Sequence, residues 1–488
     1  MLFNSADFLI FLIVVFALYY SLLKDHQVLL LIVSSFVFYA WGQPAWLILL
    51  FSSIGINSFA SWQILKNDDP KFRLSCSIVS IALNVILLAC FKYAALGVTI
   101  ASNFAPMPAA VLSFALLSLP VGISFYTFEG ISLIVDSFKK KTNAGETSIN
   151  ASLEMVKPPT ISADNHVRST ADNHVRNTAL FFSFFPHLAA GPIVRPQQFY
   201  PQIGVKRFGD IDWKGSIENL ITGYFFKTVI ADNLASQTSP FLSHFASLSG
   251  KDVIAGWLGF SARIFSDFAG YSLIAIGLAA MFGYKLPTNF NFPYRSQSLS
   301  EFWTRWHISL STWIRDYLYI PLGGNRKGTL RTYLNLMLVM LLGGLWHGGK
   351  VGLAVWGLYH GAGLCIERAL GLSHNSSKSS AVIAFRVLTV FLFFAAGLIL
   401  FELPLHMVRE CLVSIVTHWK FASDAQHTFL VCLFVLPVFI WHAVDLWAQK
   451  HPEVSARKRL LKELVLATML FMVITDSGDS REFFYFQF

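Results

Sequence analysis

Both the fold and the chemistry of this chain are indicated by residues 306–349, WHISLSTWIRDYLYIPLGGNRKGTLRTYLNLMLVMLLGGLWHGG. The stretch opens on Trp306-His307 and closes on a second pair, Trp346-His347, 40 positions later. Between the pairs, a basic, glycine-rich turn separates an aromatic segment from an apolar one. Titratable side chains inside a membrane are costly and usually functional. The stretch therefore predicts a membrane-embedded fold that holds a reaction site.

The composition of the 488-residue chain excludes a soluble globule. Hydrophobic residues make up 55% of it and charged residues 13%, with a mean hydropathy of +0.55. The apolar runs predict an all-α polytopic membrane protein with about 11–13 transmembrane or re-entrant helices of about 20 residues each. The clearest runs are residues 7–23, 46–65, 74–96 and 381–403.

Two further apolar runs are predicted to be broken. Residues 179–194 contain two prolines, and residues 253–283 are too long for one crossing and carry Arg263 and Asp267. Interrupted segments of this kind are typical of re-entrant structure. Charged residues inside a membrane also mark binding sites in carriers, so a transporter without acyl chemistry is an alternative interpretation.

The positive charge of the chain is concentrated between the apolar runs. There are 37 basic and 28 acidic residues, a net charge of +9 with neutral histidines. Basic loops favour the cytoplasmic side, beside anionic lipid, which explains the charge without a nucleic-acid partner. The predicted cytoplasmic loops are residues 139–176, 295–331 and 450–462, so the segment between the Trp-His pairs is placed in the cytoplasm.

The chain is predicted to form a single membrane-embedded domain over residues 1–488, with a polar loop insertion at about 139–178. That loop contains the hexapeptide ADNHVR twice, at 163–168 and 171–176. A local duplication in a tolerant loop explains the repeat. The alternative is a metal-binding pair, His166 and His174, but no third ligand has suitable spacing. We predict no metal site.

His347 is the candidate catalytic residue. Histidine is an ordinary general base near neutral pH, because its unperturbed pKa is about 6.5. Glycines on both sides of Trp346-His347 let backbone and ligand approach closely and are expected to break the helix. Such a histidine suits acyl transfer, in which it removes a proton from a hydroxyl or thiol that attacks a thioester. A structural histidine bonded between helices is the alternative.

Two other histidines are predicted to differ in role. His307 is separated from His347 by a proline and several glycines, so the two side chains meet only through tertiary folding. His360 lies 13 residues after His347 on the next apolar run, and we expect it to be a packed helix histidine.

Residues 315–327 are the candidate donor-binding segment. They combine aromatic faces, flexible backbone and adjacent cations, which suit a phosphorylated thioester donor such as acyl-CoA or an acyl carrier protein. A positively charged anchor at the membrane interface explains the same residues equally well. The candidate donor-binding residues are Trp306, Arg315, Asp316, Tyr317, Tyr319, Asn325, Arg326, Lys327 and Trp346.

The sequence closely resembles the membrane-bound O-acyltransferase family, in its bacterial branch that contains alginate O-acetyltransferase. The resemblance is strongest over NFNFPYRSQSLSEFWTRWHISLSTWIRDYLYIPLGGNRKG (289–328) and LLGGLWHGG (341–349). Supporting pieces are MLFNS (1–5), LPVGISFYTF (119–128), FFPHLAAGPIVRP (184–196), FSDFAGYS (265–272) and the final YFQF.

The resemblance implies a helical fold with a cytoplasmic donor entrance and a funnel toward the other face of a bacterial inner membrane. It implies that His347 is catalytic and that His307 positions the substrate or supports His347. No cofactor is bound; acetyl-CoA or another acyl thioester is the donor substrate. The expected acceptor is an extracytoplasmic polysaccharide, alginate or another exopolysaccharide, with periplasmic acetylation proteins as partners. D-alanyl transfer to an envelope polymer, or a non-catalytic scaffold for polysaccharide export, are alternatives.

The chain departs from the family pattern at several positions. Leu273 stands where the family commonly has Asp, and Glu129 and His187 each stand where it has Gln. After the second Trp-His pair, residues 349–352 read GKVG where an Ala-Asn-Trp-like pattern is expected.

Overall fold

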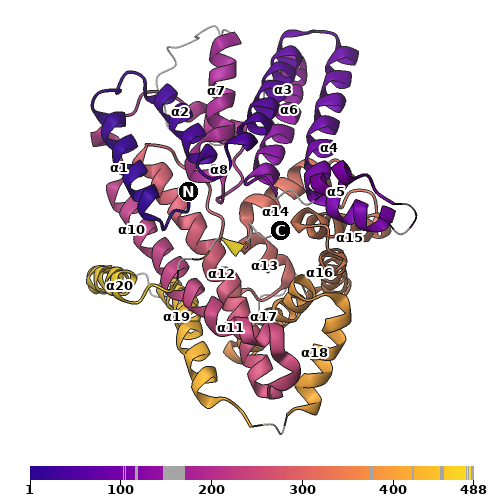
Figure 1. Cartoon of the computed structure of the whole chain (residues 1–488), viewed down its shortest axis with the longest axis vertical. Coiled ribbons are helices and arrows are strands. Elements are labelled where there is room, and N and C mark those ends of the chain that lie inside the picture. The colour runs from indigo at the N-terminus through magenta and orange to yellow at the C-terminus, as the bar shows by residue number, and fades with distance from the viewer. Residues whose placement is uncertain are drawn as a thin grey trace.

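The computed structural model describes residues 1–102, 104, 106–115, 119–146, 171–372, 379–419, 422–450, 455–479, 481, 483 and 484. Over these residues the chain forms helices and no strand, which confirms the predicted all-α class. The helices pack into one body, with helices of the first 180 residues toward one end, helices of residues 380–450 toward the other, and α12 (Gly250–Met281) between them (Figure 1).

Six helical segments of the described chain are long and apolar enough to cross a membrane. They are Pro44–Lys66, which includes α3 (Leu47–Lys66), α4 (Pro70–Ser102), α12 (Gly250–Met281), α15 (Thr329–His347), α17 (Ser380–Glu402) and the segment Ala425–Val444 of α19 (Ala425–Lys450). Two shorter apolar helices precede them, α1 (Ala6–Tyr20) and α2 (Gln27–Ala40). The four clearest runs of the sequence all lie in these helices. The other described helices are shorter or more polar, so length and composition alone do not reach the predicted 11–13.

The remaining helices connect the membrane-crossing segments and fill the interior between them. They are α5 (Ala109–Ala115), α6 (Ile123–Glu146), α7 (Ala171–Ser183), α8 (Phe185–Leu188), α9 (Pro196–Phe199), α10 (Trp213–Tyr224), α11 (Asp232–His244), α13 (Leu299–Arg305), α14 (Ile308–Ile314), α16 (Val351–Ala369), α18 (Leu405–Thr417) and α20 (Ser455–Thr475). Two π-helical segments, η4 (Phe225–Ala231) and η7 (Arg315–Tyr319), continue α10 and α14. Short 3₁₀ turns are η1 (Pro44–Trp46), η2 (Tyr200–Gln202), η3 (Phe208–Asp210), η5 (Phe245–Ser247) and η6 (Pro293–Arg295).

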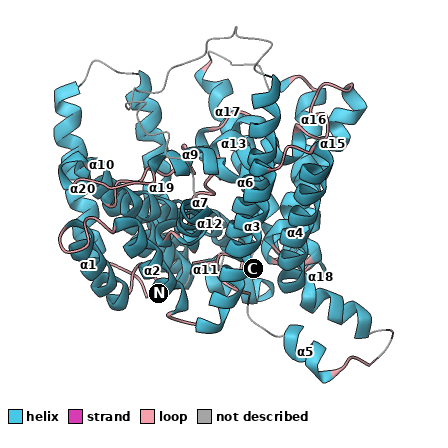
Figure 2. Cartoon of the chain, turned by 90° about the horizontal axis from the view of Figure 1, so that it is seen from above, coloured by secondary structure: helices cyan, strands magenta, loops and turns pink. Residues whose placement is uncertain are grey.

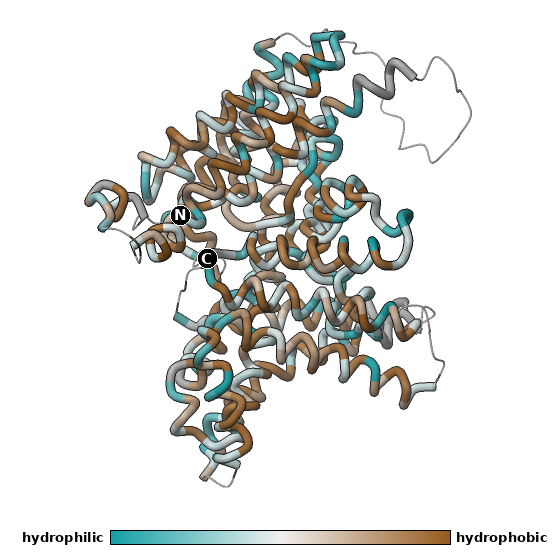
Figure 3. The backbone as a smooth tube through the Cα atoms, turned by 90° about the vertical axis from the view of Figure 1, so that its right-hand side faces the viewer, coloured by the Kyte–Doolittle hydropathy of each residue, from teal (hydrophilic) through white to brown (hydrophobic). Residues whose placement is uncertain are grey.

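Large apolar side chains cover the outside of the bundle. Ile78 and Ile86 of α4 and Phe385 of α17 are more than half exposed, as are many others. Hydrophobic residues run along the lengths of the helices in Figure 3, and α3, α4 and α6 stand side by side in Figure 2. Apolar surface on this scale matches a hydrocarbon surrounding and not water.

The predicted break in residues 253–283 is wrong, because α12 is one continuous helix of 32 residues. Asp267 lies within this helix and is paired, and Arg263 lies over the rings of Phe260 and Phe484. Asp267 lies 2.8 Å from Nζ of Lys227 and accepts a hydrogen bond from the backbone N–H of Phe484 at 2.7 Å. The break predicted within residues 179–194 is confirmed, since α7 ends at Ser183 and only the four-residue α8 follows.

The polar loop predicted at about 139–178 is helical at both ends. α6 continues to Glu146, and the second ADNHVR copy forms the first half of α7. The loop prediction for that copy is wrong because tertiary packing outweighs local composition. His174 is buried, with Nε2 2.8 Å from Oγ of Ser61 and its ring 5.4 Å from that of Trp62. The first copy, with His166, lies outside the described residues.

Glycines bring α15 and α16 close together and so fix the position of His347. A Cβ atom on Gly344 would overlap the carbonyl oxygen of Leu353, and one on Gly357 would overlap that of Met340. Small residues at facing positions let two membrane helices approach closely. The second Trp-His pair therefore stands at the end of a helix that its neighbour holds firmly.

Candidate active site

His347 ends α15 in the interior of the protein. The helix stops at this residue, with Gly348 as its cap, which confirms the helix end predicted from the flanking glycines. The side chain is 5% exposed. Its ring lies 4.9 Å from that of Trp346, 5.3 Å from Trp356 and 5.2 Å from Phe401. The imidazole is thus held on several sides by aromatic rings.

His307 precedes α14 and is buried in an unusual backbone conformation. Its φ angle of 44° is left-handed, which is uncommon for a residue with a side chain. The side chain is 1% exposed, and Nδ1 lies 3.0 Å from Oδ1 of Asn289. Non-glycine residues in this conformation persist only where their surroundings hold them, often at functional sites.

The partners of Asn289 fix which nitrogen of His307 carries the proton. Oδ1 of Asn289 accepts hydrogen bonds from the backbone N–H of Ser309 at 3.3 Å and from its hydroxyl at 2.9 Å. Nδ2 of Asn289 donates to Oγ of Ser272 at 3.0 Å. Because Oδ1 only accepts, Nδ1 of His307 must donate, which leaves Nε2 as a hydrogen-bond acceptor. Among the described residues, this buried Nε2 has no hydrogen-bond partner.

The two histidines flank the same indole. The ring of Trp346 lies 4.9 Å from His347 and 6.2 Å from His307. Tertiary folding therefore brings the two Trp-His pairs together, as the sequence requires if they act jointly. Reasoning from sequence missed Asn289, in a loop, and Ser309, in α14, because a single polar residue gives no periodic signal.

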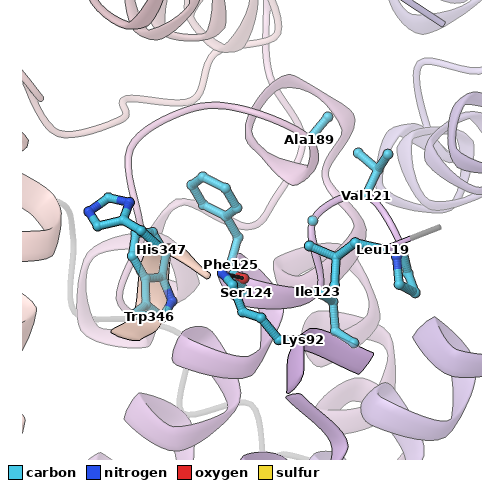
Figure 4. Close-up of a pocket in the computed structure, with 11 residues that line it drawn as sticks. Lys92, Leu119, Val121, Ile123, Ser124, Phe125, Ala189, Trp346 and His347 are labelled. Atoms are coloured by element: carbon cyan, nitrogen blue, oxygen red, sulfur yellow. Dashed lines mark hydrogen bonds between the residues drawn. The ribbon is translucent and has the colours of Figure 1, made fainter. Parts of the chain in front are cut away.

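Two cavities meet at His347. The first, here the Lys92 cavity, has a volume of about 40 Å³ and is lined by Lys92, Ser124, Phe125, Trp346 and His347 among others (Figure 4). The second, here the Arg315 cavity, has a volume of about 200 Å³; its lining includes Trp303, Arg315, Tyr319, Met340, His347 and Trp356. His347 belongs to both linings, so both cavities reach this side chain.

The predicted donor segment is divided between a cavity wall and a polar network. Arg315 and Tyr319, in η7, line the Arg315 cavity. Asp316 turns to Arg195, whose Nη1 donates to its Oδ2 at 2.7 Å, and also accepts from Nε of Arg315 at 2.6 Å. Burial raises the pKa of the Asp316 carboxyl, but the bonds from Arg315 and Arg195 outweigh it and hold that pKa below its ordinary value.

Tyr317 connects the same segment to α6. Its hydroxyl donates to Oδ2 of Asp136 at 2.9 Å, and Nζ of Lys139 lies 5.6 Å from the centre of its ring. These contacts attach η7 to the end of α6 that leads into the predicted cytoplasmic loop.

The other predicted site residues lie away from the two cavities. Trp306 is 4% exposed and packs against Phe302 and Phe394 in the core, so it lines neither cavity. Asn325, Arg326 and Lys327 are exposed in the turn before α15. His360 is fully buried among aromatic rings, which agrees with a packed helix histidine.

Glu129 and His187, which both depart from the family pattern, contact each other. Oε1 of Glu129, on α6, lies 3.0 Å from Nε2 of His187, on α8, and both side chains are 1% exposed. Nε2 of His187 also lies 3.1 Å from the carbonyl oxygen of Phe181. The chain thus departs from the family pattern at both residues of one contact.

Phe483 and Phe484 pack against aromatic residues that contact the two histidines. The ring of Phe484 lies 6.3 Å from that of Phe401, which contacts His347. The ring of Phe483 lies 5.5 Å from that of Phe268, which is 4.6 Å from His307. Reasoning from sequence did not indicate Phe483 or Phe484; the resemblance covered only the final YFQF, residues 485–488, which lie outside the described residues.

Known proteins with similar sequences identify the family of this chain. The Pseudomonas putida protein named "Probable alginate O-acetylase AlgI" is 38% identical over 394 residues, which cover 78% of this chain and 74% of that protein. The profile of the membrane-bound O-acyltransferase family matches residues 167–403. The chain belongs to the membrane-bound O-acyltransferase family. It is a multi-pass membrane protein and an acyltransferase, as the resemblance predicted.

Other relatives within the membrane-bound O-acyltransferase family differ in the acceptor that they are named for. The "Peptidoglycan O-acetyltransferase" of Helicobacter pylori is 36% identical over 71% of this chain and 65% of its own length. The "Teichoic acid D-alanyltransferase" of Bacillus subtilis is 27% identical over 49% of this chain and 56% of its own length. The matches support a membrane O-acyltransferase.

Proposed function

We propose that this membrane-bound O-acyltransferase moves an acetyl group from a cytoplasmic thioester across a bacterial inner membrane, for O-acetylation of an extracytoplasmic polysaccharide such as alginate or another exopolysaccharide. Acetyl-CoA or another acyl thioester is the donor, and the whole chain, residues 1–488, forms one membrane domain. The observation that carries the proposal is the position of His347 in the linings of both cavities.

His347 acts as the general base in this proposal. It takes the proton of an acceptor hydroxyl as the oxygen attacks the thioester carbonyl carbon. A carbon–oxygen bond forms, the carbon–sulfur bond breaks, and the proton passes from His347 to the leaving thiolate. His307 supports the reaction through Nε2, the acceptor atom that Asn289 leaves unprotonated.

The Arg315 cavity is the proposed donor side. Its wall contains Arg315 and Tyr319, and the exposed cations Arg326 and Lys327 lie in the turn that follows. Cations and aromatic faces suit the phosphates and the base of a nucleotide thioester. Asp316 and Tyr317 hold this wall in place through Arg195 and Asp136, and Trp346 lines the Lys92 cavity.

The acceptor is proposed from the relatives. The protein named as an alginate O-acetylase favours an exopolysaccharide, handed on with periplasmic acetylation proteins as partners. The peptidoglycan O-acetyltransferase of Helicobacter pylori gives peptidoglycan as the second candidate acceptor.

The test is the O-acetyl content of the exopolysaccharide and of peptidoglycan in a deletion strain. The strain is complemented with the wild type, His347→Ala, His307→Ala or the control His26→Ala, which changes an exposed histidine before α2. We expect the wild type and His26→Ala to restore acetylation of the exopolysaccharide, and His347→Ala to restore none at equal membrane levels. Restoration by His347→Ala would overturn the catalytic assignment. Acetate lost from peptidoglycan alone would make peptidoglycan the acceptor.

A further inference from the structure

Lys92 is a cation within a membrane-crossing helix, and it faces the cavity beside His347. Its Nζ donates to Oγ of Ser124 at 3.2 Å and lies 5.1 Å from the centre of the Trp346 ring. Figure 4 shows Lys92 and Ser124 joined across the cavity, next to Trp346. Neither the comparisons with relatives nor the Trp-His motifs assign a role to this lysine.

No carboxylate of the described residues lies within ion-pair distance of Lys92. Lys92 is half-buried, whereas Lys227, which is buried, contacts Asp232 at 2.7 Å and Asp267 at 2.8 Å. Lys92 has only a hydroxyl and an aromatic face. A charge inside a membrane is normally paired, so this cation is placed to receive an anion that the chain itself does not provide.

The Lys92 cavity lies at the start of α6, whereas the donor segment contacts the middle of that helix. Nη2 of Arg73 donates to the carbonyl oxygen of Phe138 at 2.7 Å, close to where Tyr317 contacts Asp136. Lys92 and Ser124 meet further along α4, at the first turn of α6. The 19 residues from Arg73 to Lys92 rise by about 28 Å, nearly the thickness of a hydrocarbon core.

We propose that Lys92 and Ser124 bind a carboxylate of an acidic acceptor, and so select acidic sugars on the acceptor side of His347. The inference rests on the proposed function, which places the donor in the Arg315 cavity. The ammonium group of Lys92 neutralises the carboxylate, and the Ser124 hydroxyl donates a second hydrogen bond. The bound carboxylate brings a sugar hydroxyl toward His347, which lines the same cavity.

The size of the cavity fits one carboxylate and little more. Its volume is about 40 Å³, and a cavity needs about 10–15 Å³ by this measure to hold one water molecule. About three such positions correspond to the heavy atoms of one carboxylate group. The rest of the sugar lies outside the cavity, toward Leu119 and Val121 at its rim.

The test is direct binding to the purified full-length protein in lipid nanodiscs. The probes are a uronic acid tetrasaccharide and its methyl ester, which differ only in the charge of the carboxyl groups. The proteins are the wild type, Lys92→Gln, Lys92→Arg, Ser124→Ala and the control Lys71→Gln, which changes an exposed lysine on the same helix. His347→Ala is added as a catalytic control.

We expect the wild type and Lys71→Gln to bind the acid at least about tenfold more tightly than the ester, as one charge-assisted hydrogen bond allows. Lys92→Gln should bind both probes alike, while Lys92→Arg keeps part of the preference. If Lys92→Gln does not fold, a weaker preference in Ser124→Ala carries the test. A wild type without preference for the acid, or a Lys92→Gln or Ser124→Ala variant that keeps the full preference, overturns the proposal.

The result is separable from the proposed function. His347→Ala should bind the acid as the wild type does and transfer no acetyl group. If His347→Ala still transfers acetyl, the catalytic assignment fails while the binding result stands. If acid and ester bind alike but His347→Ala is inactive, only the anion site fails.

Discussion

Oδ1 of Asn289 lies 3.0 Å from Nδ1 of His307 and also accepts two hydrogen bonds from Ser309, so it holds the imidazole with its proton on Nδ1. Asn289→Leu removes the acceptor and leaves a buried N–H unpaired, which costs about 1–3 kcal/mol. We expect acetyl transfer to fall at least tenfold with little change in the KM of the donor. Asn289→Asp keeps an acceptor oxygen and should retain more activity. Equal rates for the two variants would contradict this role.

The Glu129–His187 contact predicts a compensating pair of substitutions. Glu129→Gln or His187→Gln alone leaves one member of a buried pair without its partner, which costs about 3–5 kcal/mol when the group is charged. The double substitution installs the two glutamines of the family pattern and should recover part of that loss. Thermal unfolding of the four proteins in detergent gives the coupling energy, expected at about 1–3 kcal/mol. Additive losses would show that the two side chains act independently.

Phe484 is predicted to support activity without contacting substrate. Phe484→Ala removes a ring that packs on Phe401, and Phe401 in turn contacts His347. Truncating a buried phenylalanine costs about 3–5 kcal/mol. We expect a lower Tm and a lower kcat. Phe471→Ala, which truncates a side chain 64% exposed on α20, is the matched control and should change neither. A wild-type kcat in Phe484→Ala would show that Phe484 does not support activity.

The lowered pKa of Asp316 gives a defined pH dependence. A carboxyl whose pKa is lower in the folded state stabilises that state above its unfolded pKa, and this stabilisation is lost as pH falls through the folded pKa. The Tm advantage of the wild type over Asp316→Asn should therefore be constant from pH 8 to about 5, decline as pH falls below about 4, and vanish only below the lower pKa of the folded state. An advantage that disappears between pH 6 and 8 would point to a histidine instead.

Long apolar runs made the membrane helices predictable from the sequence. The runs at 74–96 and 381–403 became α4 and α17 because little except a helix satisfies the backbone of such a segment in lipid. The end of α15 at His347 was predictable for a local reason, since glycines surround it. Prediction and structure agree where interactions within a single helix determine the structure.

Tertiary contacts decided the features that the sequence did not reveal. α12 is continuous because the partners of Asp267 are Lys227, 40 residues earlier, and Phe484, 217 residues later. The tautomer of His307 depends on an asparagine from a different segment, and the Lys92 cavity on two antiparallel helices. Resemblance supplied the roles of His347 and His307, which spacing alone left open.

The segment around Phe484 also has a consequence for biogenesis. The backbone N–H of Phe484 donates to Asp267, and its ring lies against that of Phe401, which contacts His347. Phe484 follows His347 by more than 130 positions, so a chain under synthesis carries both histidines before Phe484 is added. Until then Asp267 lacks the N–H of Phe484, and Phe401 lacks one of its aromatic neighbours.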